Sequence, residues 1–110
     1  ETDEILSVDG LDAIYVGPAD LSLALGCTPK FDQEEKPVVE AIEFIAAKAK
    51  EKGIFAGIHN GEPAYARRMI ETGYRFVTMS SDSRFMAAGA KAALAGLRAG
   101  GTGGDGGGTY

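Results

Sequence analysis

Short apolar runs alternate along this chain with longer stretches whose apolar residues recur every three or four positions. The first run, Leu11–Val16, lies between a glycine and a Gly-Pro pair and predicts a buried strand. Helical spacing follows over Pro37–Lys52, where proline suits the first turn and Gly53 can end the helix. The apolar face of this helix comprises Val38, Ile42, Ile45 and Ala49.

The same alternation is then repeated. Ile54–Ile58 predicts a second apolar strand, Pro63–Thr72 a helix, and Arg75–Ser80 a third strand. The triplet Ser81-Asp82-Ser83 offers N-cap side chains to a last helix that runs to about Arg98. In the helix 63–72 the residues expected to point inward are Ala66, Met69 and Ile70. In the last helix the apolar stripe comprises Met86, Ala90, Ala93 and Leu97.

Strands that are apolar throughout, each followed by an amphipathic helix, are typical of a parallel sheet covered by helices. We therefore expect residues 1–99 to be of the α/β class and to form the last three strand–helix units of a (β/α)₈ barrel, a fold that needs about 200–250 residues. Asp3–Val8 would be the end of an earlier helix. Alone, the segment would expose two sheet edges and an apolar interior face, so we expect a truncated barrel. Residues 100–110 predict a glycine-rich, disordered tail.

Composition narrows the classes of partner. The 110 residues are 45% hydrophobic and carry a net charge of −5, and the largest basic cluster is the pair Arg67–Arg68. This balance argues against nucleic acid and anionic membrane as partners. A single cysteine, Cys27, cannot form an internal disulfide, which favours a cytoplasmic location. No base lies near it in the sequence, so we do not expect a catalytic nucleophile.

The sharpest motif is Gly-Pro-Ala-Asp-Leu-Ser, residues 17–22, directly after the first strand. In a barrel the carboxyl ends of the strands face the active site. Gly17 allows close approach of a ligand, and a short helix over Asp20–Leu25 would present backbone N–H groups to a carboxylate. Asp20 adds a hard oxygen ligand suited to Mg²⁺ or Mn²⁺. From the pattern alone, a helix cap and a metal ligand both stay open for Asp20.

The stretch GLDAIYVGPADLSLALG, residues 10–26, closely resembles the HpcH/HpaI aldolase family, and residues 57–90 resemble the strand–helix–strand–helix that follows it there. The resemblance spans about residues 3–99 in collinear order. It implies a metal-dependent class II aldolase, an aldehyde-lyase that cleaves 4-hydroxy-2-oxo acids to pyruvate and an aldehyde. Family members of this kind act in the catabolism of aromatic compounds or sugar acids.

Carried over residue by residue, the resemblance makes Asp20 the ligand of a divalent cation (Mg²⁺, Mn²⁺ or Co²⁺). It makes Gly17, Pro18 and Ala19 the loop that seats the carboxylate of a 2-oxo acid. In the family a glutamate from the preceding strand completes the metal site, and the His–Asp base and a substrate-binding arginine come from earlier strands. No catalytic base is therefore assigned within this chain, and we expect the chain alone to be inactive.

His59 is the only histidine and follows the second strand, where the family usually has an aliphatic residue lining the aldehyde pocket. A substrate contact, a structural hydrogen bond and a catalytic base all stay open for it. Asp82 is predicted to be the N-cap of the last helix. Arg67 and Arg68 are expected on a solvated face, and Phe85 and Met86 are expected to be packing residues.

Two alternatives to the aldolase remain. One is a non-catalytic half-barrel that serves as an assembly module through its open edges and last helix. The other is a CoA-thioester lyase of the citrate lyase beta-like type, although the proline in the motif favours the free-acid aldolases. The resemblance also predicts a homo-oligomer that forms through the last helix.

Overall fold

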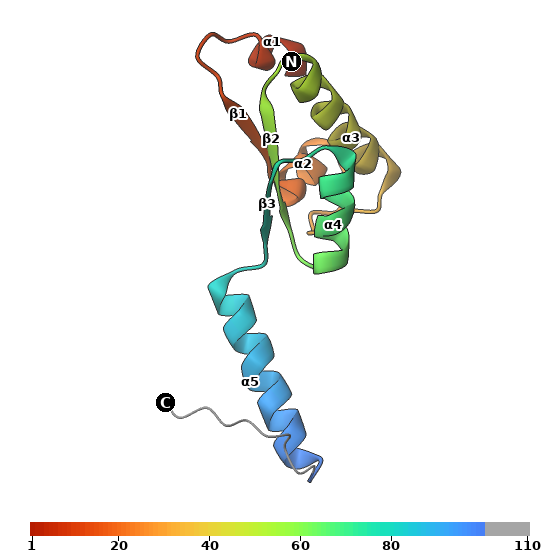
Figure 1. Ribbon diagram of the computed structural model, residues 1–110. Helices are drawn as coiled ribbons and strands as arrows, with labels where there is room; N and C mark the ends of the chain where they lie inside the picture. The colour runs from red at the N-terminus through yellow and green to blue at the C-terminus, as the bar shows by residue number, and fades with distance from the viewer. Residues whose placement is uncertain (101–110) are drawn as a thin grey trace. The chain divides into compact units, whose positions relative to one another are not determined.

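Three parallel strands form a single sheet in the computed structural model, which describes residues 1–100 (Figure 1). The strands are β1 (Ala13–Val16), β2 (Phe55–Asn60) and β3 (Phe76–Met79), in the order β1-β2-β3. Parallel pairing places the carboxyl ends of all three strands at one edge of the sheet. The predicted parallel α/β arrangement is confirmed.

The strand ends differ from the predicted bounds by one or two residues. The first strand begins at Ala13 rather than Leu11, and the second extends two residues beyond Ile58. The third stops before Ser80, whose φ of 53° leaves the extended region. These shifts arise because a strand lasts only as long as its neighbour offers a ladder partner, which the local pattern does not contain.

Five helices are described in residues 1–100: α1 (Thr2–Leu6), α2 (Pro18–Ala24), α3 (Lys36–Glu51), α4 (Pro63–Thr72) and α5 (Asp82–Arg98). The bounds of α4 are those the sequence predicts, with proline in the first turn and Gly73 at φ 123° after the last. The short helix α2 starts at Pro18 instead of Asp20, because the fixed φ of proline suits the first helical position. Asp20 therefore lies inside the first turn.

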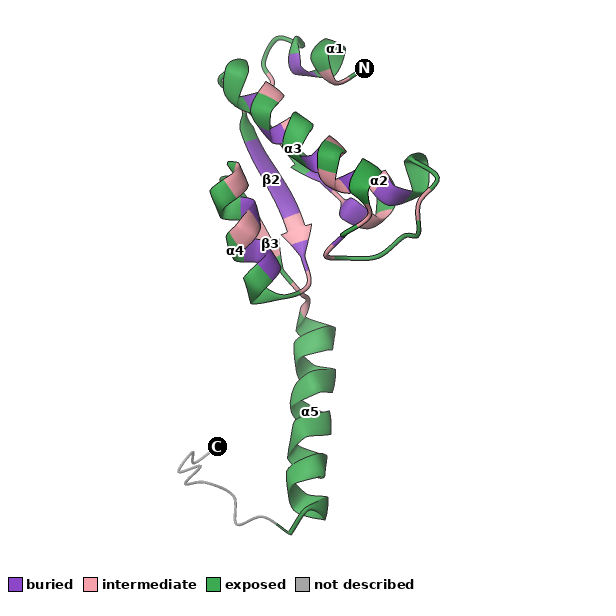
Figure 2. Cartoon of the chain, turned by 90° about the vertical axis from the view of Figure 1, so that its right-hand side faces the viewer, coloured by how far each residue is buried: buried purple, intermediate pink, exposed green. Residues whose placement is uncertain are grey.

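The core lies between the sheet and the two helices α3 and α4, which contact β2 and β3 (Figure 2). Val38, Ile42 and Ile58 have no exposed surface, and Tyr74 donates from its hydroxyl to the Ile42 carbonyl at 2.7 Å. Ala66 and Met69 point inward as predicted. The prediction for Ile70 is wrong, since 59% of it is exposed. The buried face of α4 comprises Tyr65, Ala66 and Met69, so it is turned toward Tyr65 and away from Ile70.

The opposite face of the sheet is open. Tyr15, Phe55 and Phe76 are each more than half exposed on it. This confirms the expected apolar face, and it corrects the prediction that Leu11–Val16 is a buried strand, since only Val16 of β1 is buried. A strand that is apolar on both sides is fully buried only when both faces of the sheet are covered.

The described residues from 81 to 100 belong to a second unit, in which α5 has no buried residue. Its N-cap is Ser81, whose hydroxyl accepts from the Arg84 amide at 3.3 Å, so the assignment of the cap to Asp82 is wrong. Phe85 and Met86 are 60% and 74% exposed and are not packing residues within the described chain. The predicted disordered tail lies outside the described residues apart from Gly100. No helix in residues 1–100 combines the length and apolar character needed to cross a bilayer.

Candidate substrate and metal site

The turn after β1 folds a carboxylate back over a glycine. Gly17 is the N-cap of α2 and its carbonyl accepts from the Leu21 amide at 2.9 Å. A Cβ built on Gly17 would lie 3.1 Å from Asp20 Oδ2. The position above Gly17 is therefore filled by the carboxylate of Asp20, and a side chain at residue 17 would displace it. The exposed Asp20 faces solvent at the carboxyl edge of the sheet.

Buried neighbours hold this turn in place. Pro18 is buried, and its carbonyl accepts a hydrogen bond from the buried hydroxyl of Ser22. A cleft of about 560 Å³ runs beside the turn, lined by Tyr15, Gly17 and Asp20 together with side chains of α1, α2 and α3. The structure thus brings the predicted residues Gly17, Pro18, Ala19 and Asp20 together in one turn at the mouth of a cleft.

Asp20 supplies one oxygen donor group toward a divalent cation. Within residues 1–100, no three His, Cys, Asp or Glu side chains lie close enough together to hold a metal ion. Mg²⁺ is commonly held by one or two carboxylates together with water and substrate oxygens. The donor chemistry of Asp20 fits such a cation.

His59 lies at the carboxyl end of β2, half-buried, on the open face of the sheet. Its Nδ1 is 2.8 Å from the Thr78 hydroxyl, and the ring of Phe31 meets the imidazole edge-on with centroids 5.0 Å apart. Val16 is paired with Ile58, so one residue further along both strands Gly17 is level with His59. The sequence predicts His59 at the end of the second strand, where the structure has it, but it does not predict the contacts of His59 with Thr78 and Phe31.

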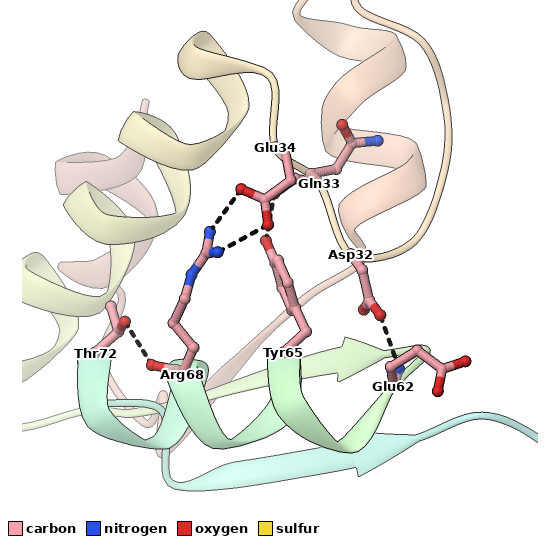
Figure 3. A network of polar contacts seen from close by, with 7 residues as sticks. All are labelled: Asp32, Gln33, Glu34, Glu62, Tyr65, Arg68 and Thr72. Carbon is pink, nitrogen blue, oxygen red and sulfur yellow. Dashed lines mark hydrogen bonds and ion pairs between the residues drawn. The ribbon is translucent and has the colours of Figure 1, made fainter.

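The segment between α2 and α3 is fastened to α4 (Figure 3). The Asp32 carboxylate accepts from the amides of Gly61 and Glu62 at 2.7 and 2.8 Å. The Tyr65 hydroxyl donates to the carbonyl of Gln33 at 2.7 Å. These contacts hold the segment that carries Phe31 against the carboxyl ends of the strands.

A paired arginine reinforces this attachment. Arg68 donates to both carboxylate oxygens of Glu34, at 2.8 and 3.2 Å, and its guanidinium lies 4.7 Å from the ring centroid of Tyr65. The hydrogen bond that Arg68 donates to Glu34 raises the pKa of the Arg68 guanidinium above its usual value. Arg67 is exposed as predicted, whereas Arg68 is tied to the loop rather than simply solvated. Neither residue lies in the turn at Asp20.

A parallel sheet with helices on one face and a Gly-Pro-Ala-Asp turn at the carboxyl end of a strand places this chain among the α/β proteins, in which ligands bind at this edge of the sheet. A family model identifies the group: the HpcH/HpaI aldolase/citrate lyase model matches residues 1–88. The chain belongs to this family, which confirms the resemblance inferred from the GPADLS motif.

Individual relatives agree with this assignment. The chain is 42% identical over 97 residues to the hydroxypyruvate/pyruvate aldolase of Rhizorhabdus wittichii, covering 88% of this chain and 39% of the relative. It is 37% identical over 93 residues to the 4-hydroxy-2-oxo-heptane-1,7-dioate aldolase of Salmonella paratyphi B, covering 83% of this chain and 34% of that protein. The chain therefore spans less than two fifths of the length of these curated relatives.

A solved structure supports the fold. The crystal structure of an HpcH/HpaI aldolase/citrate lyase family protein from Burkholderia cenocepacia superimposes with a TM-score of 0.82 at 35% identity. The match covers 89% of this chain and 37% of that protein. The close agreement over most of the described residues shows that the three strands and their helices adopt the family's arrangement.

Proposed function

We propose that this chain carries the metal-ligand turn of a divalent-metal-dependent class II aldolase, an aldehyde-lyase that cleaves 4-hydroxy-2-oxo acids to pyruvate or a close relative and an aldehyde. The observation that supports this most directly is the Asp20 carboxylate held over Gly17 at the carboxyl edge of the sheet. Membership of the HpcH/HpaI family supports it independently. Two relatives are named as aldolases, one acting on hydroxypyruvate or pyruvate and one on a 4-hydroxy-2-oxo dicarboxylic acid.

In this proposal each part of the turn has a separate task. Asp20 holds the cation, which would be Mg²⁺, Mn²⁺ or Co²⁺, and the backbone of Gly17, Pro18 and Ala19 seats the carboxylate of the 2-oxo acid. When bound, the cation supplies Lewis-acid polarisation of the substrate oxygens. The fixed turn keeps Asp20 in place so that no reorganisation is needed when the substrate enters.

The proposal also holds that this chain is inactive by itself. Among residues 1–100 Asp20 has no second and third potential metal ligand grouped with it, and the single histidine is engaged through Nδ1 by Thr78. A cation held by one carboxylate would bind weakly, and proton transfer needs a base within hydrogen-bond reach of the substrate. Both would come from the part of the protein that corresponds to the unmatched length of the relatives.

A hybrid enzyme tests the proposal. In the R. wittichii aldolase, this chain would replace the matched 39%, and pyruvate release would be measured with and without Mn²⁺. We expect Asp20→Ala to lower the metal-dependent rate at least about 100-fold, because Lewis-acid catalysis contributes several kcal/mol. Asp9→Ala is the matched control and should leave the rate unchanged. Undiminished metal affinity and turnover in Asp20→Ala would refute the role of Asp20. Turnover of malyl-CoA or citramalyl-CoA in place of the free acid would favour the CoA-thioester lyase.

A second candidate is an assembly module built from this half-barrel. The observation that favours it is the open apolar face bearing Tyr15, Phe55 and Phe76, since exposed contiguous apolar surface marks interaction sites. The proposal includes homo-oligomers that form through α5. Size-exclusion chromatography of the chain distinguishes the outcomes: a discrete folded oligomer supports the module, and a monomer or aggregate without defined size opposes it.

A further inference from the structure

A hydrogen-bond chain crosses the open face of the sheet and links side chains from all three strands. The Tyr15 hydroxyl lies 2.6 Å from the Thr78 hydroxyl, which in turn lies 2.8 Å from His59 Nδ1. His59 and Thr78 are register partners on neighbouring strands. Tyr15 belongs to β1, however, which is separated from β3 by β2.

Gly57 is what allows Tyr15 to reach across β2. Tyr15 and Gly57 are register partners, and a Cβ built on Gly57 would lie 2.9 Å from Tyr15 Cδ2 and 3.1 Å from Phe76 Cδ1. The tyrosine ring therefore lies over a backbone position that has no side chain. Phe76 meets this ring on its other side, with centroids 6.0 Å apart.

The chemistry of the three groups sets the direction of the chain. Thr78 has one hydroxyl hydrogen and two acceptor lone pairs, so it can donate to only one of its two partners. A phenol is a stronger donor than an alcohol, and Nδ1 of a neutral imidazole can accept through its lone pair. The favoured order is Tyr15 to Thr78 to His59 Nδ1. Neutral His59 then carries its hydrogen on Nε2.

The free end of this hydrogen-bond chain lies at the carboxyl edge of the sheet, the edge at which the Gly17–Asp20 turn follows β1. Within residues 1–100 no hydrogen bond to His59 Nε2 is found, and the register places His59 level with Gly17. Phe31 packs edge-on against the imidazole, so the ring is held on a second side. Tyr15 itself lines the cleft that contains Asp20.

We propose that Tyr15 and Thr78 are positioning residues that fix His59 as a hydrogen-bond donor through Nε2, and that this donor recognises a hydroxyl group on the aldehyde half of the substrate. The inference rests on the proposed function, in which the Gly17–Ala19 backbone and the cation on Asp20 take the 2-oxo acid half. A single neutral N–H suits one hydroxyl oxygen, whereas a carboxylate is best met by two donors or by a cation.

The donor state of His59 is measurable on this chain by itself. Because the chain has one histidine, two-bond ¹H–¹⁵N correlation spectra of the imidazole have one set of signals. We expect the Nε2–H form to dominate in the parent chain, and Thr78→Val to produce a mixture of both neutral forms. Thr72→Val is the matched control, since its hydroxyl donates only to the Arg68 carbonyl within α4. A dominant Nδ1–H form, or no change in Thr78→Val, would overturn the hydrogen-bond chain.

The preference of the hybrid enzyme between two aldehydes tests whether His59 recognises a hydroxyl group. With pyruvate as the donor, addition to glycolaldehyde would be compared with addition to propanal, in which a methyl group replaces the hydroxyl. We expect kcat/KM to favour glycolaldehyde about 3- to 10-fold, the effect of one neutral hydrogen bond, and mainly through KM. His59→Leu should remove the preference, Thr78→Val and Tyr15→Phe should reduce it, and Thr72→Val should keep it.

Different results of these experiments contradict the role of His59 and the proposed aldolase function on which it rests. A hybrid that uses both aldehydes equally, or whose preference survives His59→Leu, contradicts recognition by His59 while the aldolase proposal stands. If His59→Leu instead removes a preference for glyoxylate, the donor recognises a carboxylate and the hydroxyl assignment is wrong. A hybrid without any metal-dependent turnover contradicts the proposed function, and the imidazole spectra then decide the hydrogen-bond chain alone.

Discussion

Asp32 offers a sharp test of how this fold holds its loop, because its carboxylate accepts from the N-cap amide of a distant helix and from the amide before it. The N-cap residue of α4, Glu62, makes no side-chain cap hydrogen bond of its own. Asp32 supplies the acceptor from a position 30 residues earlier, with bonds of 2.7 and 2.8 Å to the amides of Gly61 and Glu62. Replacing Asp32 should therefore loosen both α4 and the segment before α3.

The size of the effect follows from two separate contributions. Loss of a helix cap costs about 0.5–2 kcal/mol, and hydrogen bonds to a charged group contribute about 1.5–3 kcal/mol each when buried. Asp32 is only half-buried and water can replace part of both bonds, so we expect about 2 kcal/mol for their loss. Asp32 also has a φ of 51°, where alanine is disfavoured by about 1–2 kcal/mol relative to glycine.

Three substitutions separate these contributions. Asp32→Gly should lower the free energy of unfolding by about 2 kcal/mol, and Asp32→Ala by about 3 kcal/mol because it adds the backbone term. Asp32→Asn keeps one acceptor oxygen and tolerance of positive φ, and it should cost about 1 kcal/mol. Urea unfolding followed by circular dichroism gives these values, and hydrogen exchange of the Gly61 and Glu62 amides reports the local effect. Asp9→Ala is the control and should change stability by less than about 0.5 kcal/mol. Three Asp32 variants that all lie within that range of the parent would refute the cap.

Two further predictions concern the open face and the loop. Gly57→Ala should lower the free energy of unfolding in urea by about 1–3 kcal/mol, because the new methyl group would meet Tyr15 at 2.9 Å and the Phe76 carbonyl at 3.0 Å. An unchanged unfolding midpoint would contradict this close approach. The control Gly96→Ala adds a methyl group that meets nothing within 4 Å, and it should instead increase helicity. Cys27 should react slowly with iodoacetamide at neutral pH, because desolvation and then the neighbouring Glu35 raise the thiol pKa and lower the thiolate fraction. The rate of Cys27 alkylation should rise with pH and should be faster in Glu35→Gln. A rate equal to that of a free peptide thiol would refute the raised thiol pKa.

Local signals were sufficient for the helices and for the order of the elements. The bounds of α4 follow from Pro63 at its start and Gly73 at its end, and both act within one turn of the helix. The turn at Gly17 and Asp20 is local in the same sense, since the two residues lie three positions apart. Such features depend on backbone preferences that a short stretch of sequence carries by itself.

Hydrogen bonds between residues far apart in the sequence could not be predicted from such local signals. The Tyr15–Thr78 bond joins residues 63 positions apart, and the Asp32–Gly61 bond joins residues 29 apart. Tyr15 looks like one more apolar member of a buried strand, because nothing local shows that Gly57 leaves space for its ring. The position of Ser81 rather than Asp82 as the cap of α5 is a smaller failure of the same kind, since both residues have suitable side chains.

The open face of the sheet makes the hydrogen bonds among Tyr15, Thr78 and His59 important for this site. Its neighbours Phe55 and Phe76 are apolar, and in a barrel this face would be turned toward the interior, where polar groups without partners are costly. Tyr15 and Thr78 satisfy each other and His59 Nδ1, and within residues 1–100 no hydrogen bond to the far nitrogen of the imidazole, Nε2, is found. Closing the barrel would raise the penalty for leaving that nitrogen unpaired, and a ligand oxygen beside the Gly17–Asp20 turn would relieve it. For this reason the selectivity expected from His59 should be larger in a closed barrel than the partial exposure of its side chain in this three-stranded sheet suggests.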